Sequence, residues 1–538
     1  MRLTFLTELK NEFQDYNLGK LSKDFMAGLT VTAVALPLAL AFGVSSGADA
    51  ASGLITAIVA GLIVSFFSGA FYQISGPTGA MAAILMSIIA KYHMQGVFVA
   101  TLIAGILLVI AGILHLGKIT SFIPSPVITG FTSGIAIIIV LGQLDNFFGV
   151  HSEGATALSK LLSYSRLGFQ PDIQTLCVGM FVILLMIFFP KKWNNVIPAS
   201  LLGIILATAF SILLKLDVKV VGEIPKTLFP SERLHLSGIT WEHIEGVFSP
   251  AVSIAMLCMI ESLLCGASAG RLADKAMNSD QELIAQGIGN ILLPFFGGIP
   301  ATAAIARTSV AIKSGAKTRL TGIIHGIGLL IAMFVLSPVM SKIPLAALAG
   351  VLIVTAWRMN EWSAIKYMFS KKFKGPVVKY IITMVATVAL DLTTAILIGV
   401  LLGLFMFVIK SADIQISIEE VDPMRIGKDE NTNVDNWCVV YIAGPMFFMT
   451  ADVIKRKLSS LIDYDVVILS LRGVSMADIT SVGVIMDFCK QAKTGKHTVL
   501  FSSIQPSVMK LFRQAGLVDS IGEEAFYYSV DKVLLELL

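Results

Sequence analysis

The sequence predicts an α-helical membrane protein of about fourteen spans, followed by a soluble α/β domain at its C-terminal end. Two observations support this prediction. Of the 538 residues, 55% are hydrophobic and only 14% are charged, which is too apolar for an ordinary soluble domain. The apolar residues gather in runs of roughly 20 as far as Lys410, and a helix needs this length to cross a bilayer.

The charge balance and the cysteines exclude several classes of function. The net charge is only +4 and the basic residues are spread between apolar segments, so we expect no nucleic-acid-binding surface. No nucleophile triad or phosphate-binding loop stands out, and we expect neither an enzyme nor a bound metal or cofactor. The cysteines lack metal-ligand spacing and their number is odd, so we interpret them as reduced thiols: Cys177, Cys258, Cys265, Cys438 and Cys489.

A cytoplasmic segment, residues 1–24, precedes the predicted membrane domain, residues 25–410. The first residues have no basic start, apolar core or cleavage site of a signal peptide, so insertion is expected to rely on the spans. The clear spans begin near Phe25, Ser52, Val97, Gln174, Ile197, Ala251, Leu283, Thr321, Val377 and Leu392. Spans that are short, or kinked by Pro and Gly, begin near Pro77, Thr120, Thr302 and Pro344.

The distribution of basic residues tests this number of spans, because a miscount by one would scatter them over both sides of the membrane. With the N-terminus inside, most fall in cytoplasmic loops, including Lys20, Lys23, Lys313 and Arg319. An even number of spans returns the C-terminus to the same side. We therefore predict a multi-pass protein of the bacterial inner membrane, embedded in the lipid bilayer, with both termini cytoplasmic.

The composition changes after Lys410. A polar linker and the first part of the soluble region occupy residues 411–436, and a second domain is predicted at residues 437–538. Strand-like runs at residues 439–443, 466–471 and 498–501 alternate with amphipathic helical stretches at residues 451–462, 481–492, 507–515 and 531–538. This alternation predicts an α/β sandwich.

Two interrupted segments stand out among the spans. Residues 72–81 and 297–307 are rich in Gly, Ala and Pro, and each is expected to be an extended stretch that enters a short helix. Pro77 suits a first helical turn, where its missing N–H would be unpaired anyway. Either segment alone would be better explained as a tight loop with Gly and Pro for its turns. As a pair in the third and tenth spans, they indicate a substrate site near the middle of the membrane, and helix N-termini favour an anion there.

Three side chains near these segments are further candidates. Glu261 lies inside an apolar run, and an ionisable residue at membrane depth is expensive enough to suggest function, here the uptake and release of a coupled proton. The alternative role for Glu261 is structural, as the acceptor of a hydrogen bond from a backbone donor. Arg307 either adds positive potential to the site or anchors the cytoplasmic end of its helix. Phe42, in the first span, either lines the site or only packs.

The chain resembles the SulP sulfate-permease family, which is similar to it over nearly its whole length. The matching residues are Ala35-Leu36-Pro37-Leu38-Ala39-Leu40-Ala41-Phe42-Gly43, Ser75-Gly76-Pro77-Thr78-Gly79, Glu261-Ser262-Leu263-Leu264, Gly298-Ile299-Pro300-Ala301-Thr302 and Arg307-Thr308. The resemblance implies two inverted seven-span repeats, divided into a core and a gate domain that move past each other like an elevator. It also implies a homodimer.

Carried over by position, the family's anion site has three parts in this sequence. The third span contributes Gly76, Thr78 and Gly79, and the first span contributes Phe42. The tenth span contributes residues 301–303, which are Ala301, Thr302 and Ala303. Glu261 takes the position of the family's coupling acid.

The sequence departs from the family at two informative places. The sodium-coupled bicarbonate members look to have Asp at the position of Glu261 and Thr at that of Cys265, and a thiol is a poor sodium ligand. We therefore expect proton coupling in preference to sodium coupling. The soluble domain resembles a STAS domain, but Ile479 stands where a related anti-sigma-factor antagonist has its phosphorylated serine. A phospho-switch is thus not expected, and regulation, trafficking, dimer contacts or a cytoplasmic partner remain its candidate roles.

Together these features predict a secondary active transporter of small anions, namely sulfate, bicarbonate, chloride or a dicarboxylate, driven by protons through elevator-type alternating access. The alternatives are a sodium-coupled bicarbonate transporter and an anion channel or exchanger. Glu261 separates the classes, because a channel needs no coupling acid.

Overall fold

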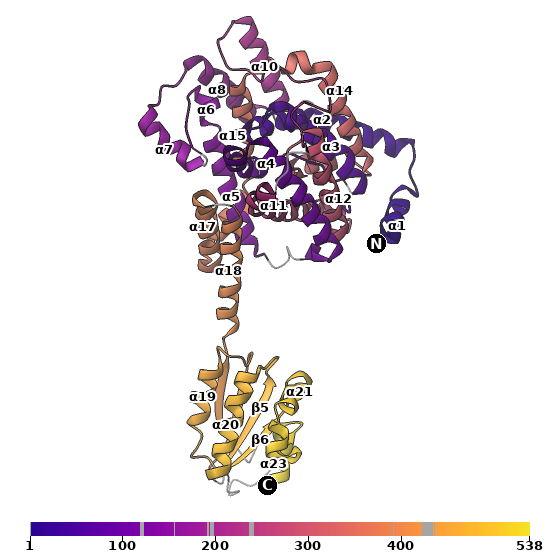
Figure 1. Cartoon of the computed structure of the whole chain (residues 1–538). Helices are drawn as coiled ribbons and strands as arrows, with labels where there is room; N and C mark the ends of the chain where they lie inside the picture. Colours follow the sequence, from indigo (N-terminus) through magenta and orange to yellow (C-terminus); the bar gives the residue numbers. More distant parts are fainter. Residues whose placement is uncertain are drawn as a thin grey trace. The chain divides into compact units, whose positions relative to one another are not determined.

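The computed structural model describes residues 2–70, 72–118, 123–154, 157–190, 193, 198–235, 241–390, 392–421, 434, 436–495 and 497–538. The chain divides into two compact units, residues 1–403 and residues 404–538, and each is described by itself (Figure 1). The finer boundaries predicted at residues 25, 411 and 437 stay predictions. The predicted starts of two spans, Thr120 and Ile197, lie outside the described residues.

Helices dominate the chain as far as residue 411. In order they are α1 (Arg2–Phe13), α2 (Leu18–Ser45), α3 (Ala50–Phe67), α4 (Gly79–Ile113), α5 (Ser125–Gly142), α6 (Leu144–Phe148), α7 (Ala157–Leu167), α8 (Ile173–Phe188), α10 (Ala199–Leu213), α11 (Trp241–Ala273), α12 (Ser279–Leu292), α13 (Ile305–Lys313), α14 (Leu320–Met340), α15 (Leu345–Met359), α16 (Trp362–Ser370), α17 (Lys374–Ala389) and α18 (Leu392–Ser411). A 3-10 turn, η3 (Leu293–Phe296), follows α12.

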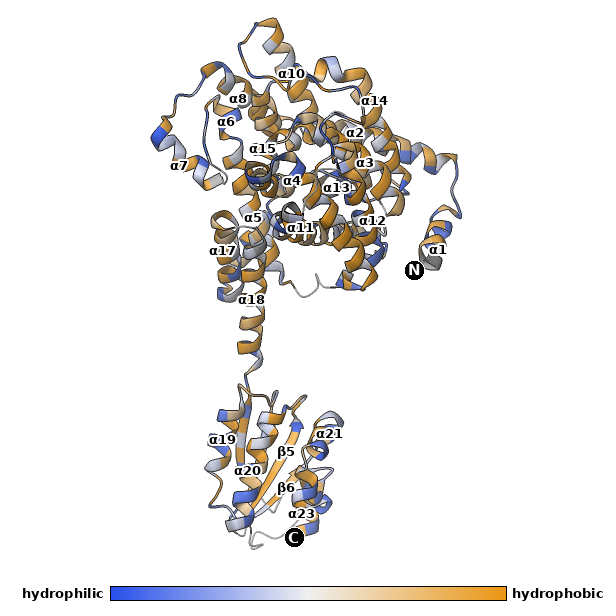
Figure 2. Cartoon of the chain, viewed as in Figure 1, coloured by the Kyte–Doolittle hydropathy of each residue, from blue (hydrophilic) through white to orange (hydrophobic). Residues whose placement is uncertain are grey.

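Within the described residues, six helical segments are long and apolar enough to cross a membrane. Four shorter apolar helices accompany them, and Figure 2 shows most of these helices as hydrophobic along their length. The six segments are 18–45, 50–67, 84–113, 125–148, 244–270 and 320–340. The number of fourteen spans therefore stays a prediction.

Helix α4 joins two segments that the sequence predicts as separate spans. It runs over 35 residues, but His93 breaks its helical geometry with φ 55° and ψ −170°. The part before His93 is the short helix expected after Pro77. Pro124 and Pro344 directly precede α5 and α15, as expected for a residue that has no N–H to donate.

The helices around the interrupted segments pack closely. Helix α4 lies along α11 and α12, and α3 lies against α2, α12 and α14. Gly105 of α4 and Gly287 of α12 face each other, and a Cβ on Gly287 would lie 2.7 Å from the carbonyl oxygen of Gly105. Small residues at such crossings bring helix backbones together, which fixes α12 beside both broken segments.

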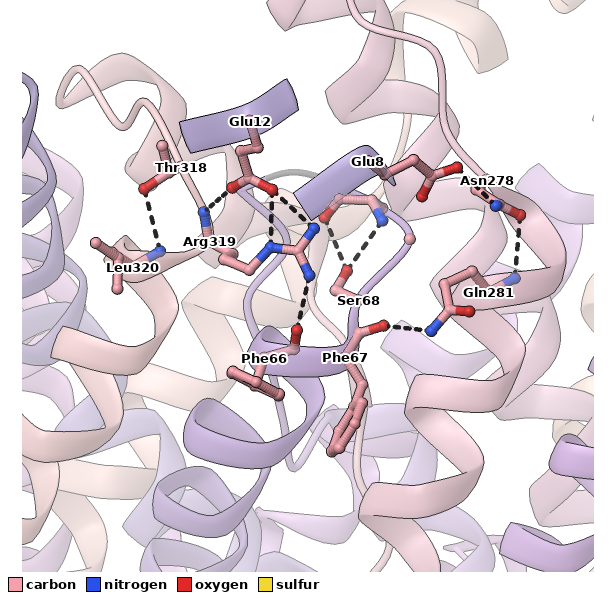
Figure 3. Close-up of polar contacts among 12 residues, drawn as sticks. Glu8, Glu12, Phe66, Phe67, Ser68, Asn278, Gln281, Thr318, Arg319 and Leu320 are labelled. Atoms are coloured by element: carbon pink, nitrogen blue, oxygen red, sulfur yellow. Dashed lines mark hydrogen bonds and ion pairs between the residues drawn. The ribbon is translucent and has the colours of Figure 1, made fainter. Parts of the chain in front are cut away.

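The N-terminal helix α1 is fastened to the loops at the ends of these helices (Figure 3). Glu12 accepts hydrogen bonds from the backbone N–H and from Nε of Arg319, at 2.7 and 2.8 Å, and the two side chains are only 3% and 4% exposed. Nη1 of Arg319 also donates to the carbonyl oxygen of Phe66, at 2.7 Å. Arg319, expected as an ordinary basic loop residue, is thus a buried structural cation that joins α1, α3 and α14.

The second unit is built on a five-stranded sheet. The strands are β3 (Gln415–Glu420), β4 (Trp437–Ala443), β5 (Val466–Gly473), β6 (Thr498–Ser502) and β7 (Phe526–Tyr527), in the spatial order β3-β4-β5-β6-β7. Only the β3–β4 pair is antiparallel. The helices are α19 (Ala451–Ser459), α20 (Ile479–Gly495), α21 (Pro506–Gln514), α22 (Leu517–Ile521) and α23 (Val530–Leu537).

The inner strands of this sheet are buried on both faces, as is usual for parallel strands. On β5, Val467 and Leu469 pack with α19, α20 and α21, while Ile468 packs with α23 on the other face. Figure 2 shows β5 and β6 as hydrophobic strands among helices that carry hydrophilic residues. The predicted α/β domain is confirmed, and its linker residues 422–433 lie outside the described part of the chain.

The start of α20 contains Ile479, the position at which a related anti-sigma-factor antagonist has its phosphorylated serine. Asp478 accepts a hydrogen bond from the backbone N–H of Ser481 at 2.9 Å, and the Ser481 hydroxyl accepts one from the backbone N–H of Asp478 at 3.3 Å. This reciprocal pairing is a helix cap. Ile479 lies exposed between the two, so the position of the phosphorylated serine holds an apolar surface residue.

Candidate functional site

The two interrupted segments, distant in sequence, lie against each other. They form a short antiparallel ladder between β1 (Ser75–Gly76) and β2 (Thr302–Ala303), in which Ser75 faces Ala303 and Gly76 faces Thr302. The backbone N–H of Ala304 extends this ladder by donating to the carbonyl oxygen of Ile74 at 2.9 Å. Helix α4 leaves from one strand and α13 from the other, so the ladder fixes the two helix starts relative to each other.

Thr78 caps the N-terminus of α4. Its hydroxyl oxygen accepts a hydrogen bond from the backbone N–H of Met81 at 3.4 Å, and the helix begins at Gly79. Pro77 therefore precedes the cap and lies two positions before the first helical turn in which the sequence suggested it. The reason is that Thr78, with its side-chain acceptor, is the better N-cap residue.

Phe42 of α2 lies directly over this helix start. A Cβ on Gly79 would lie 3.2 Å from Cε1 of Phe42 and 2.2 Å from Cδ1 of Ile139. Phe42 is 8% exposed. A glycine at position 79 is therefore needed for the close approach of both side chains, and the start of α4 is enclosed by apolar groups.

The N-terminus of α13 is different. Its N-cap residue, Ala304, has no side chain that can accept a hydrogen bond, and Ile305 and Ala306 are exposed. The first N–H groups of any helix lack partners within the helix. Because no side chain caps α13, these donors and their partial positive charge remain available to a ligand.

Arg307, in the first turn of α13, points back toward the other segment. Its Nη2 donates to the carbonyl oxygen of Pro77 at 2.8 Å, and its side chain is almost fully buried. Nη1 has no hydrogen-bond partner among the described residues. It lies so close to Gly76 that a Cβ there would be 2.6 Å away. A buried cation with an unused donor is costly, and an anion would satisfy it.

Glu261 of α11 is also joined to the first segment. The Thr78 hydroxyl donates to Oε2 of Glu261 at 3.0 Å, and Glu261 is half-buried. The two charged candidates therefore meet at residues 77 and 78, Arg307 at the carbonyl of Pro77 and Glu261 at the hydroxyl of Thr78. Arg307 belongs to the second segment by chain position, and only the direction of its side chain brings it to the first.

Residues 301–303 of the second segment form hydrogen bonds with other parts of the protein. The backbone N–H of Ala301 donates to Oδ1 of Asn290, and Nδ2 of Asn290 donates to the carbonyl oxygen of Ala301, both at 2.9 Å. The hydroxyl of Ser262 is hydrogen-bonded to the hydroxyl of Thr302 at 3.0 Å, and it also accepts a hydrogen bond from the backbone N–H of Ala303 at 3.3 Å. In this conformation the segment offers an anion few free donors, and direct contacts from residues 301–303 stay a prediction.

Several residues around the site were missed by sequence reasoning. They are Ser262 of α11 and the polar side chains of α12, Glu282, Gln286 and Asn290, all of which are fully buried. The spacing of four residues between the three α12 side chains was a visible signal, because it places them on one face of that helix. Within the described chain, no group of three His, Cys, Asp or Glu residues has the arrangement of a metal site.

Comparison with families of known proteins gives two matches. The model of the sulfate permease family matches residues 21–383, and that of the STAS domain matches residues 427–533. The putative sulfate transporter YvdB of Bacillus subtilis is 32% identical to this chain, over 97% of this chain and 98% of its own length. The bicarbonate transporter BicA of Picosynechococcus sp. is 31% identical, over 85% of this chain and 84% of its own.

Solved structures agree with these matches. The transmembrane domain of a cyanobacterial bicarbonate transporter BicA superposes with a TM-score of 0.64 at 29% identity, covering 72% of this chain and 98% of that one. Murine Slc26a9, an anion transporter in an inward-facing state, superposes with a TM-score of 0.82 at 16% identity, covering 97% and 92% of the two chains. At this lower identity the second match shows the fold alone.

Proposed function

The chain belongs to the sulfate permease family, a family of multi-pass membrane transporters, and from this premise we propose that it is a secondary active transporter that binds small anions between the N-termini of α4 and α13. The substrate is one of sulfate, bicarbonate, chloride or a dicarboxylate. Two relatives carry the names of a sulfate and a bicarbonate transporter, and these anions are therefore the first to test.

The observation that supports this site most strongly is the buried guanidinium of Arg307. Its Nη2 is bonded to the carbonyl of Pro77, whereas its Nη1 has no partner among the described residues. An oxyanion between the two helix starts would accept from Nη1 and from the uncapped N–H groups of α13. Gly76, Thr78, Gly79 and Phe42 would form the opposite wall, with residues 301–303 behind.

Coupling to protons is proposed through Glu261. Its hydrogen bond from Thr78 ties its protonation to the residue that caps α4, so loss or gain of a proton would change the wall of the anion site. Cys265, one turn further along α11, donates to the Thr308 hydroxyl at 3.3 Å and supplies sulfur where a sodium site would need oxygen. This favours proton over sodium coupling, and a sodium-coupled bicarbonate transporter is the second candidate.

The remaining parts of the proposal follow from the family. Transport would proceed by elevator-type alternating access in a homodimer of the bacterial inner membrane, with both termini cytoplasmic. The STAS domain would serve regulation, trafficking, dimer contacts or a cytoplasmic partner. An anion channel or exchanger is the alternative to coupled transport.

Uptake of labelled sulfate, bicarbonate, chloride and succinate into proteoliposomes tests the function, with proton and sodium gradients imposed separately. We expect saturable accumulation of one of these anions under an inward proton gradient and none under a sodium gradient alone. If a sodium gradient alone drives the same accumulation, sodium and not the proton is the coupling ion. No uptake of any of the four anions would reject the proposed substrate class.

The variant Glu261→Gln separates binding from coupling, because the amide keeps an acceptor for Thr78 but cannot release a proton. It should bind the anion and exchange it across the membrane, yet fail to accumulate it against a gradient. Unchanged proton-driven accumulation in this variant would remove Glu261 from the coupling step.

A further inference from the structure

One face of α12 carries three polar side chains that the proposed transport step does not use. Glu282, Gln286 and Asn290 are separated by four residues each and are completely buried. Eight residues of helix span about 12 Å, so the row is long enough to reach both interrupted segments. Polar groups inside an apolar bundle are retained only where they are bonded, and each of these three is.

The first member of the row, Glu282, holds the chain that leads into β1. Its Oε2 accepts from the Ser68 hydroxyl at 2.6 Å and from the backbone N–H of Gly69 at 3.1 Å. Its Oε1 accepts from Nε2 of Gln286 at 2.8 Å. All these partners are donors, which matches the acceptor-only character of a carboxylate.

The second member, Gln286, continues the row into the site. Its Nε2 also donates to the hydroxyl of Ser75 at 2.8 Å. Ser75 is the first residue of β1 and directly precedes Gly76. Gln286 therefore connects the carboxylate of Glu282 to the strand from which the start of α4 follows.

The third member, Asn290, holds the second segment. Its side-chain amide pairs with both backbone groups of Ala301, donor to acceptor and acceptor to donor, as a neighbouring strand would. Ala301 directly precedes β2, and α13 begins four residues later. The position of Ala301 therefore helps to fix where the first turn of α13, including Arg307, lies.

We propose that Glu282, Gln286 and Asn290 are positioning residues for the anion site. Fixed on one helix, they hold both interrupted segments in one register, so that the N-termini of α4 and α13 and the free nitrogen of Arg307 keep their alignment through the transport cycle. This inference rests on the proposed function for its effect on transport. The three side chains do not contact the anion, and they act through Ser75 and Ala301.

The test uses the full-length protein with Asn290→Asp. This variant has nearly the same shape and keeps the acceptor for the N–H of Ala301, but it places a carboxylate against the carbonyl oxygen. We expect KM for the transported anion to rise roughly tenfold while the maximal rate changes less, because one buried bond is lost and an acceptor is left unpaired. Asn17→Asp at the exposed N-cap of α2 is the matched control, and its KM should stay that of the wild type, since Asp accepts the capping bond as well as Asn does.

A double variant distinguishes positioning from a general loss of stability. If Asn290 acts by aligning Arg307, then Asn290→Asp combined with Arg307→Lys should raise KM little beyond Arg307→Lys alone. Effects on KM that multiply, or an unchanged KM in a properly folded Asn290→Asp protein, would overturn the proposal.

Amide hydrogen exchange gives a readout that does not depend on transport. Asn290→Asp should speed exchange in both interrupted segments, residues 72–81 and 297–307, with the rest of the membrane unit unchanged. Gln286→Met, which keeps the length but removes the donors, should do the same and replaces Asn290→Asp if that variant does not fold. Faster exchange in only one segment would contradict a shared register, whereas a wild type that transports no tested anion would reject the proposed function alone.

Discussion

The two helices that begin at the candidate site, α4 and α13, treat the unpaired N–H groups of their first turns in opposite ways. Helix α4 satisfies its own N-terminus, because Thr78 caps it and Phe42 and Ile139 enclose it. Helix α13 has no side-chain cap, begins with exposed residues and carries the buried Arg307. The two halves are therefore not equivalent: α4 provides a capped wall that is apolar around Gly79, and α13 provides the positive charge and the free donors.

The largest effect is expected from removal of the charge on α13. Arg307→Gln should lower kcat/KM for the anion roughly a hundredfold, because truncating one member of a buried charge pair costs several kcal/mol. Arg358→Gln, which alters another membrane-unit arginine that donates to a backbone carbonyl, is the control and should keep its KM. Saturable uptake by Arg307→Gln with the wild-type KM would show that α13 does not provide the charge.

A smaller effect is expected when the wall of α4 is disturbed. Gly79→Ala would drive a methyl group into Ile139 and Phe42, and overpacking of this kind costs about 1–3 kcal/mol. Uptake should fall roughly tenfold together with thermal stability. Gly483→Ala on α20 is the matched control, since no atom lies near its added methyl group. Normal uptake and stability in Gly79→Ala would mean that the start of α4 is not a tight wall.

The smallest effect comes from making α13 resemble α4. Ala304→Ser places a capping hydroxyl at the N-cap, where it would compete with the anion for the first N–H groups. We expect KM to rise about threefold, since anion interactions with a helix terminus are worth only about 0.3–1 kcal/mol. Asp49→Ser, which keeps a side-chain cap on α3 away from the site, should leave KM unchanged. A lower KM in Ala304→Ser would show that the uncapped terminus does not bind the anion.

The sequence alone predicted the helical membrane unit, the α/β domain and the places where two spans break. These features depend on local patterns: apolar runs, alternation of strand and helix, and clusters of Gly, Ala and Pro near Gly76 and Ala301. The confirmed family resemblance rests on the same stretches. The number of spans is harder to predict from the sequence, because α4 joins two predicted spans through a break at His93.

The geometry of the candidate site was not predictable in the same way. The pairing of Ser75 with Ala303 joins residues far apart in the chain, and it depends on how whole helices pack. The direction of Arg307 was open between a site residue and a terminal anchor until the carbonyl of Pro77 was found as its partner. Asn290 was missed because its role depends on η3, which turns the chain back so that Ala301 lies beside it.

Protection of the start of α13 by the transported anion tests the central claim most directly. A cysteine is placed at the exposed Ala306 in a background with Cys177→Ser, because Cys177 is exposed and the other four cysteines are buried. Labelling of Ala306→Cys by a charged maleimide should slow as the anion is added, with half-protection near its KM. Lys313→Cys, at the other end of the same helix, should label at a constant rate. Equal labelling of Ala306→Cys with and without saturating anion would contradict an anion site at the N-terminus of α13.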